Sequence, residues 1–255
     1  MKTVAVIALN TYKETIRDKL LYNLLIFAIL LISSSVILST LTVGERSKII
    51  VDLSLAGVNI FGVLIAIFVG IGLVSKEIEK KTIYTIISKP VRRWQFLIGK
   101  YAGLLMVLAV NLTLMTVFLY VAQLAGEWGL RPELLKAIWM IYVELMVVTA
   151  LALLFSTFTT STLAAIFTLS LYVIGHLSSS IKEFADRIGG TFASVIANVI
   201  YYSLPNLDYF NIKAEVVHQV PVSMTYLAWS SLYGVAYVAV ILLVAAVIFQ
   251  RRDFK

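Results

Sequence analysis

A carboxyl group and two amides lie inside long apolar segments of this sequence, and they are its first candidates for chemistry. Glu144 is in the middle of residues 134–155, and Asn111 and Asn59 lie inside two other apolar segments. A charge at the centre of a membrane-spanning helix costs roughly 2.5–3.5 kcal/mol on insertion scales, so such residues usually face a bundle interior or a water-filled cavity. We expect Glu144 either to hydrogen-bond a neighbouring helix, for example through Asn111, or to line a substrate path together with Asn111 and Asn59.

The connection after the second apolar segment carries a dense group of charges. Glu77 stands three and four residues before two lysines, a spacing that supports a short helix, and Pro90 should end that helix near residue 89. We therefore expect one short helix over about 75–89, on the inner side of the membrane. Its charges would either fix the topology and meet anionic lipid, or let the helix dock in the groove of a partner protein. The spacing favours neither.

Motifs for nucleotide, metal or acyl-transfer chemistry do not occur in the sequence. Gly99-Lys100 is followed by Tyr101 and lacks the upstream glycine of a phosphate-binding loop, and neither HExxH nor GxSxG is present. The chain has no cysteine, and His176 and His218 are both expected on the outer side, where single histidines are more often solvated or locally hydrogen-bonded than bound to metal. We expect no catalytic residue, no metal site and no cofactor on this chain.

Six apolar segments must position these side chains. Hydrophobic residues make up 60% of the 255 residues and charged residues 14%, against about 25% charged in a soluble domain, which excludes a soluble enzyme. Backbone groups in lipid must pair within their own segment, so the segments are predicted to be α-helices. The predicted fold is an all-α integral membrane protein, one transmembrane domain over 1–255, with spans at about 20–41, 53–74, 101–125, 134–155, 162–179 and 226–249.

The basic residues are unevenly distributed between the two sides of these spans. With both termini inside, fourteen of the 21 Lys and Arg residues lie on the inner side and seven on the outer side. Because Lys and Arg are enriched in cytoplasmic loops, both termini are predicted to be cytoplasmic. The net charge of +7 then reflects orientation, and we expect no nucleic-acid partner.

Two further segments are predicted to be helical without spanning the membrane. Residues 3–19 have one apolar face and one charged face, which favours a helix in the inner membrane interface over a soluble helical extension. Residues 191–204 are too short to span, which favours a re-entrant or interfacial outer helix before the last span. Gly99 and Gly103 would permit close helix approach, either within one protomer or between two copies.

Three stretches of the sequence carry a resemblance to a known family. They are SKEIEKKTI (75–83) followed by SKPVRR (88–93) and GK (99–100), then LPN (204–206), and FQRRDF (249–254). They resemble the type-2 ABC (ATP-binding cassette) exporter permeases, and most closely the subgroup described as permeases of multicopper-enzyme maturation systems. One position departs from the family pattern, because Lys81 stands where a glycine commonly precedes the threonine.

The resemblance implies partners that the residues alone do not show. It implies a homodimer in the cytoplasmic (inner) membrane, in which each protomer engages one cytoplasmic ABC ATPase through the N-terminal interfacial helix and the 75–89 helix. ATP and Mg would be bound by that ATPase. The resemblance assigns Glu77, Glu79 and Thr82 to the helix that couples to the ATPase, and Arg92 and Arg93 to its exit.

The sequence is therefore interpreted as the permease subunit of an ATP-driven exporter, with an unidentified, lipid-like or amphipathic substrate. The alternative is a non-conducting subunit that transmits ATPase motion to an extracytoplasmic partner, which the small number of polar residues in the spans keeps open. A secondary transporter is disfavoured, because no matching pair of spans is interrupted by glycine or proline.

Overall fold

The computed structural model describes residues 2–40, 46–79, 92–125, 131–188 and 191–251, and these residues form helices and connections without a strand among them. Six helices in the described part are long and apolar enough to cross a membrane, which confirms the predicted all-α fold with six spans. They are α2 (Lys19–Thr40), α3 (Arg46–Glu79), α5 (Arg93–Ala125), α6 (Glu133–Ser156), α7 (Ser161–Ile188) and α10 (Met224–Arg251).

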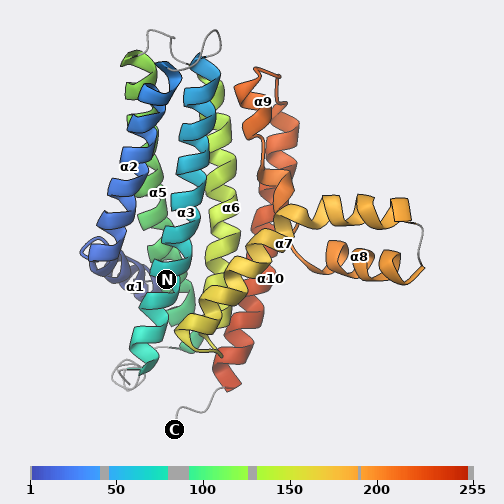
Figure 1. Ribbon diagram of the computed structural model, residues 1–255. Helices are drawn as coiled ribbons and strands as arrows, with labels where there is room; N and C mark the ends of the chain where they lie inside the picture. Colours follow the sequence, from blue (N-terminus) through green and yellow to red (C-terminus); the bar gives the residue numbers. More distant parts are fainter. Residues whose placement is uncertain (1, 41–45, 80–91, 126–130, 189–190, 252–255) are drawn as a thin grey trace.

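Helix α6 lies at the centre of the bundle, with α3, α5, α7 and α10 packed against it (Figure 1). Fifteen of its 24 residues are buried. A helix that carries apolar residues on every side is typically buried on every side, and the α6 sequence is apolar in this way. The central position of α6 puts Glu144 in the interior of the protein.

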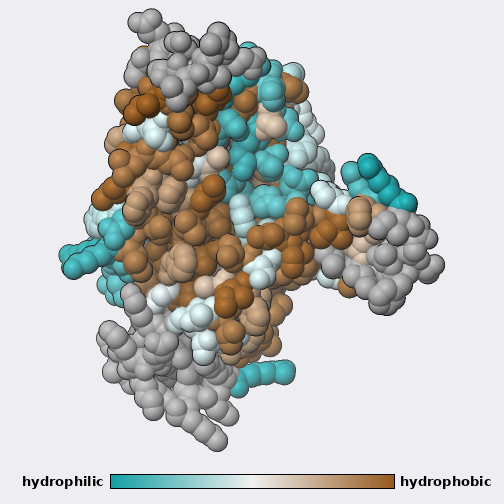
Figure 2. All heavy atoms as spheres, in the orientation of Figure 1, coloured by the Kyte–Doolittle hydropathy of each residue, from teal (hydrophilic) through white to brown (hydrophobic). Residues whose placement is uncertain are grey.

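The outward faces of the peripheral helices are apolar. Leu30 on α2, Phe167 on α7 and Leu243 on α10 are all exposed, and Figure 2 shows hydrophobic residues over much of the left and middle of the body. A soluble monomer rarely exposes so large a contiguous apolar surface. This surface is the one that the six spans present to lipid.

Helix α3 is longer than the predicted span. It runs without a break from Arg46 to Glu79, so the span predicted at 53–74 and the first residues of the helix predicted at 75–89 form a single helix. Neither glycine nor proline occurs between residues 73 and 89, so no helix breaker separates the two. The rest of the predicted 75–89 helix falls on residues outside the described part of the chain.

Helices α7 and α8 (Thr191–Ser203) project together from the side of the bundle (Figure 1). α7 continues nine residues beyond the predicted end of its span at 179. The added turns are stabilised by contacts with α8, since the Lys182 ammonium lies 4.2 Å from the centre of the Tyr201 ring. The segment predicted at 191–204 is thus helical, and its depth in the membrane stays a prediction.

A compact connection leads from α8 back to the last span. It comprises a 3₁₀ turn, η1 (Leu207–Phe210), and the short helix α9 (Lys213–Val217). Asn206 caps η1, because its side-chain oxygen accepts a hydrogen bond from the Asp208 amide at 3.0 Å. The Asn206 backbone N–H also donates to the Tyr233 hydroxyl of α10 at 2.9 Å, and its side-chain Nδ2 donates to Ser179 Oγ of α7 at 3.0 Å. This single residue therefore ties the connection to two spans.

Candidate functional site

Glu144 is the centre of a buried polar cluster that joins three spans. Its side chain is fully buried, and each carboxylate oxygen has its own partner. Asn59 Nδ2 of α3 donates to Oε2 at 3.1 Å, and His176 Nε2 of α7 lies 2.8 Å from Oε1. Tyr172, one turn before His176, donates its hydroxyl to Asn59 Oδ1 at 3.0 Å. The cluster thus links α3, α6 and α7 through hydrogen bonds between their polar side chains.

These contacts explain how a carboxyl group is tolerated in an apolar bundle. A buried polar group without partners loses its solvation, whereas a fully hydrogen-bonded one recovers much of that loss. The Tyr172 and His176 rings also pack edge to face, with centroids 4.7 Å apart. His176 keeps 19% of its side-chain surface exposed and Tyr172 is also only partly buried, so the α7 side of the cluster reaches towards the protein surface.

One expected contact of Glu144 is wrong, and another contact was not predicted. Asn111 does not bond Glu144, because its Nδ2 donates to the Val107 carbonyl of its own helix at 2.9 Å. His176 is part of the polar cluster and was not predicted to meet Glu144. Its signal in the sequence was its place one helical turn after Tyr172, which puts both rings on one face.

Hydrophilic surface covers part of the bundle face that Figure 2 shows. Figure 2 shows hydrophilic residues over the upper part of the face in view, where Figure 1 has the upper ends of α3 and α6 and the short helix α9, and extending down towards α7. α3 and α9 are in contact, and Asp52, Asp208 and Asn211 are exposed on or beside these elements. The elements that carry the cluster are therefore the ones that border this hydrophilic area.

The helix α1 (Lys2–Thr15) packs against α5 at two glycines. A Cβ atom on Gly99 would lie 2.7 Å from Ile7 Cβ, and one on Gly103 would lie 2.6 Å from Thr11 Cβ. Only glycine allows helices to approach so closely. Gly99 and Gly103 thus serve packing within one protomer. The contact also includes Lys100, buried and 3.5 Å from the exposed Glu14 carboxylate.

Arg93 joins the beginning of α5 to the end of α10. Its Nη1 donates to the carbonyl oxygens of Phe249 and Gln250, both at 3.1 Å. These carbonyls belong to the last turn of α10, where helix carbonyls lack partners within the helix and a cation is favoured by the helix dipole. Phe96 stacks on Phe249 beside this contact, with centroids 6.1 Å apart. We call this contact the α5–α10 clamp.

The residues assigned to ATPase coupling occupy the ends of two spans. Glu77 and Glu79 belong to the last turns of α3. Arg92 is exposed and precedes α5, and Arg93 is its first residue. Thr82 lies outside the described residues. Arg93 bonds the last turn of α10 and is not part of the Glu144 cluster.

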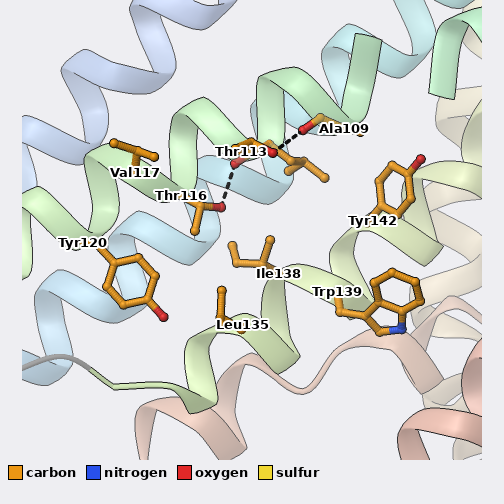
Figure 3. Close-up of a pocket in the computed structure, with 10 residues that line it drawn as sticks. Ala109, Thr113, Thr116, Val117, Tyr120, Leu135, Ile138, Trp139 and Tyr142 are labelled. Atoms are coloured by element: carbon orange, nitrogen blue, oxygen red, sulfur yellow. Dashed lines mark hydrogen bonds between the residues drawn. The ribbon is translucent and has the colours of Figure 1, made fainter. Parts of the chain in front are cut away.

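An apolar groove lies between α5 and α6 (Figure 3). It has a volume of about 380 Å³. Its polar side chains are turned to internal partners, since Thr113 and Thr116 donate to carbonyls one turn earlier and Trp139 Nε1 donates to Ser231 Oγ at 3.0 Å. The groove therefore offers hydrocarbon contacts.

Within the described ranges no three His, Asp or Glu side chains gather as a set of metal ligands, and the Glu144–His176 pair supplies only two. The arrangement is suited to joining helices and to transmitting their movement.

Comparison with known proteins gives one match over nearly the whole chain. Residues 5–254 match the protein family described as "ABC-2 family transporter protein". No curated protein matches the sequence.

Proposed function

Because the chain belongs to the ABC-2 transporter family, and is therefore a multi-pass membrane permease subunit that works with an ATPase subunit, we propose that it forms the transmembrane half of an ATP-driven exporter. The proposed location is the cytoplasmic membrane, with both termini in the cytoplasm. ATP and Mg²⁺ belong to the ATPase chain in this proposal. The likeness to the multicopper-enzyme maturation subgroup stays a prediction.

The observation that carries the proposal is the continuity of α3. The helix begins at Arg46, contains Asn59 of the polar cluster, and ends at Glu79 beside the predicted ATPase contact. Eighteen residues separate Asn59 from Glu77, or about 27 Å of helix at 1.5 Å per residue. A displacement applied at the inner end of an unbroken helix is carried to the Glu144 cluster.

Helix α5 supplies a second route for movement. Its first residue, Arg93, clamps the end of α10, and its next turns hold α1 at Gly99 and Gly103. Closure of the two ATPases on ATP would displace the 75–89 segment and both helices attached to it. The spans would then move as near-rigid bodies and switch a central path between inward and outward openings.

The proposed substrate path follows the hydrophilic area beside α3, α7 and α9. His176 is a partly buried member of the cluster; it contacts Glu144, which in turn accepts a hydrogen bond from Asn59. The apolar walls of the spans suit a lipid-like or amphipathic substrate. Asn111 is a weaker candidate, because its side-chain amide donates to its own helix.

A second copy of the chain is the proposed partner within the membrane. The hairpin of α7 and α8 leaves large side chains exposed on its surface, including Phe184, Val195 and Tyr202. Burying such side chains in a contact with another subunit would stabilise a homodimer. The hairpin would then lie at or near the dimer interface.

Charge reversal at Glu77 and Glu79 tests the ATPase contact. We expect Glu77→Lys together with Glu79→Lys to reduce recovery of the ATPase subunit in a pull-down at least tenfold, with no change in membrane insertion. Glu133→Lys at the opposite end of the bundle, where Glu133 is exposed at the start of α6, is the matched control and should leave recovery unchanged. Full recovery with the double variant would refute the docking role.

One observation favours the alternative of a non-conducting subunit. Both Glu144 oxygens are bonded inside the bundle, so neither is free to contact a substrate in this conformation. Such a subunit would pass motion to an extracytoplasmic partner. ATPase assays on the purified complex distinguish the two functions. A transported substrate should stimulate the ATPase of an exporter, whereas the ATPase of a force-transmitting complex should be stimulated only by the outer partner.

A further inference from the structure

A second groove lies between α5 and α10 at the end of the bundle where the α5–α10 clamp sits. It has a volume of about 500 Å³ and is lined by Trp94 and Ile98 of α5 and by Ala239, Ala246 and Gln250 of α10. The two alanines are seven residues apart and share one face of α10. Their small side chains leave the space that the larger neighbours enclose.

The dimensions of this groove match one leaflet of a bilayer. From Gln250 to Ala239 it follows eleven residues of α10, which is about 16 Å of helix, or roughly half of a 30 Å hydrocarbon core. Trp94 and Gln250 lie at its end near the helix termini, and tryptophan favours the level of the lipid headgroups. The groove therefore runs from the interface to about the middle of the membrane.

Arginines surround the interfacial end of the groove. Arg92 and Arg251 are both exposed there. Arg93, which follows Arg92 in the sequence, donates hydrogen bonds to the last carbonyls of α10. The first turn of α5 contains no acidic residue, and the last turn of α10 ends with Arg251. Clusters of basic residues at a membrane surface attract anionic headgroups, at roughly 1 kcal/mol per residue, or about fivefold in affinity.

We propose that this groove binds an anionic phospholipid. One acyl chain lies between α5 and α10 against Ile98 and the two alanines, and the phosphate lies beside Arg92 and Arg251. The lipid would fill the space beside the α5–α10 clamp. The proposal does not depend on ATPase docking, because it concerns the permease chain in a bilayer alone.

The groove between α5 and α6 is an internal control. It also contains a tryptophan, Trp139, but the charges beside it are mixed, with Arg131 just before α6 and Glu133 in its first turn. Tyr120, in the lining of this groove, donates to the Arg131 carbonyl at 3.0 Å. Lipid should enter both grooves, and only the α5–α10 groove should prefer an anionic headgroup.

Quenching by brominated lipids tests the proposal on the full-length chain without ATPase. Two variants each keep one of the four tryptophans, Trp94 or Trp139, with the other three replaced by phenylalanine. Each is reconstituted in phosphatidylcholine vesicles, and the fraction of brominated phosphatidylglycerol or brominated phosphatidylcholine is increased. We expect half-maximal quenching of Trp94 at a roughly 25-fold lower fraction of the glycerol lipid, about fivefold for each of the two arginines, and no such difference for Trp139.

Two further variants connect the preference to the groove. Arg92→Gln with Arg251→Gln should remove the preference at Trp94, and Ala246→Phe should reduce quenching of Trp94 by both lipids by filling the groove. Equal quenching of Trp94 by the two lipids, or a preference that survives loss of both arginines, would overturn the proposal. Quenching of Trp139 without any of Trp94 would also overturn it, because a protein segment would then cover the groove.

Discussion

His176 Nε2 and Glu144 Oε1 lie 2.8 Å apart between α7 and α6, although the two residues are 32 positions apart in the sequence. Asn59 holds the other carboxylate oxygen from α3. A single side chain on the central helix thus fixes the positions of two neighbouring spans. Any rearrangement of α3 against α7 during transport has to break or reorient these contacts.

Removal of the Glu144 carboxyl should destabilise the bundle. Glu144→Ala leaves Asn59 and His176 without their buried partner, which we expect to lower the free energy of unfolding by about 2–4 kcal/mol. Thermal unfolding of the purified protein in detergent measures this. Asn111→Ala is the control, because Asn111 is equally buried and bonds only its own helix, so its loss should be under about 1 kcal/mol. Equal losses for the two variants would contradict the joining role of Glu144.

The role of Glu144 in transport is tested by a milder change. Glu144→Gln keeps the shape of the side chain and an oxygen acceptor but removes the charge. We expect it to fold and to slow substrate-stimulated ATPase activity of the complex several-fold. Unchanged activity together with unchanged stability would remove Glu144 from the substrate path.

Close packing of α1 on α5 should depend on Gly103. Gly103→Ala would place a Cβ 2.7 Å from the Ala8 carbonyl oxygen, which is backbone that cannot move aside, so α1 should detach. Limited proteolysis at Lys13 or Arg17 should then become faster. Gly72→Ala is the control, since no described atom lies within 4 Å of its added Cβ, and we expect a gain of about 0.5–1 kcal/mol in helix stability. Proteolysis at the wild-type rate in Gly103→Ala would contradict this account of the contact.

Loss of the α5–α10 clamp should separate the two helix ends. Arg93→Gln cannot reproduce the charged bonds to the Phe249 and Gln250 carbonyls, and we expect a broader distance distribution between spin labels placed on the two ends. The chain has no cysteine, so labelling sites are introduced without background. Arg92→Gln, which also removes one charge there, should leave the distribution unchanged. A narrow distribution in Arg93→Gln would show that the stacking of Phe96 on Phe249 suffices.

We expect a pH dependence from the paired tyrosines Tyr201 and Tyr209. The hydrogen bond between the Tyr209 and Tyr201 hydroxyls, 3.0 Å apart, favours the neutral Tyr209 phenol and, with burial, raises the pKa of Tyr209 to about 12. The stabilisation belongs to the neutral phenol, so it is complete below the ordinary pKa of about 10 and is lost as the pH rises towards 12. Tyr201→Phe should lower the pKa of Tyr209 towards 10, seen as earlier phenolate absorbance. Tyr202→Phe, at the exposed neighbouring position, should leave the titration unchanged. Titration of Tyr209 near 10 in the native protein would contradict the bond.

Hydropathy was sufficient to predict the spans, because a bilayer requires long apolar segments whatever their contacts. Hydropathy underestimated the length of α7 and did not predict that α3 continues past its span. Both helices extend beyond the apolar region into polar turns, which a hydropathy criterion leaves out. The partner of Glu144 was not predictable for a different reason. The choice between Asn111, Asn59 and His176 depends on which faces of α3, α5 and α7 turn towards α6, and that is set by packing of the whole bundle.

The docking of α1 on α5 has a consequence for the order in which the protein assembles. Ile7 and Gly99 touch across 92 positions of sequence, so during synthesis α1 leaves the ribosome long before its binding surface exists. Until α5 enters the bilayer, the apolar face of α1 can be covered only by lipid at the membrane surface. Although α1 is made before α5, it therefore reaches its final position only after α5 has entered the bilayer.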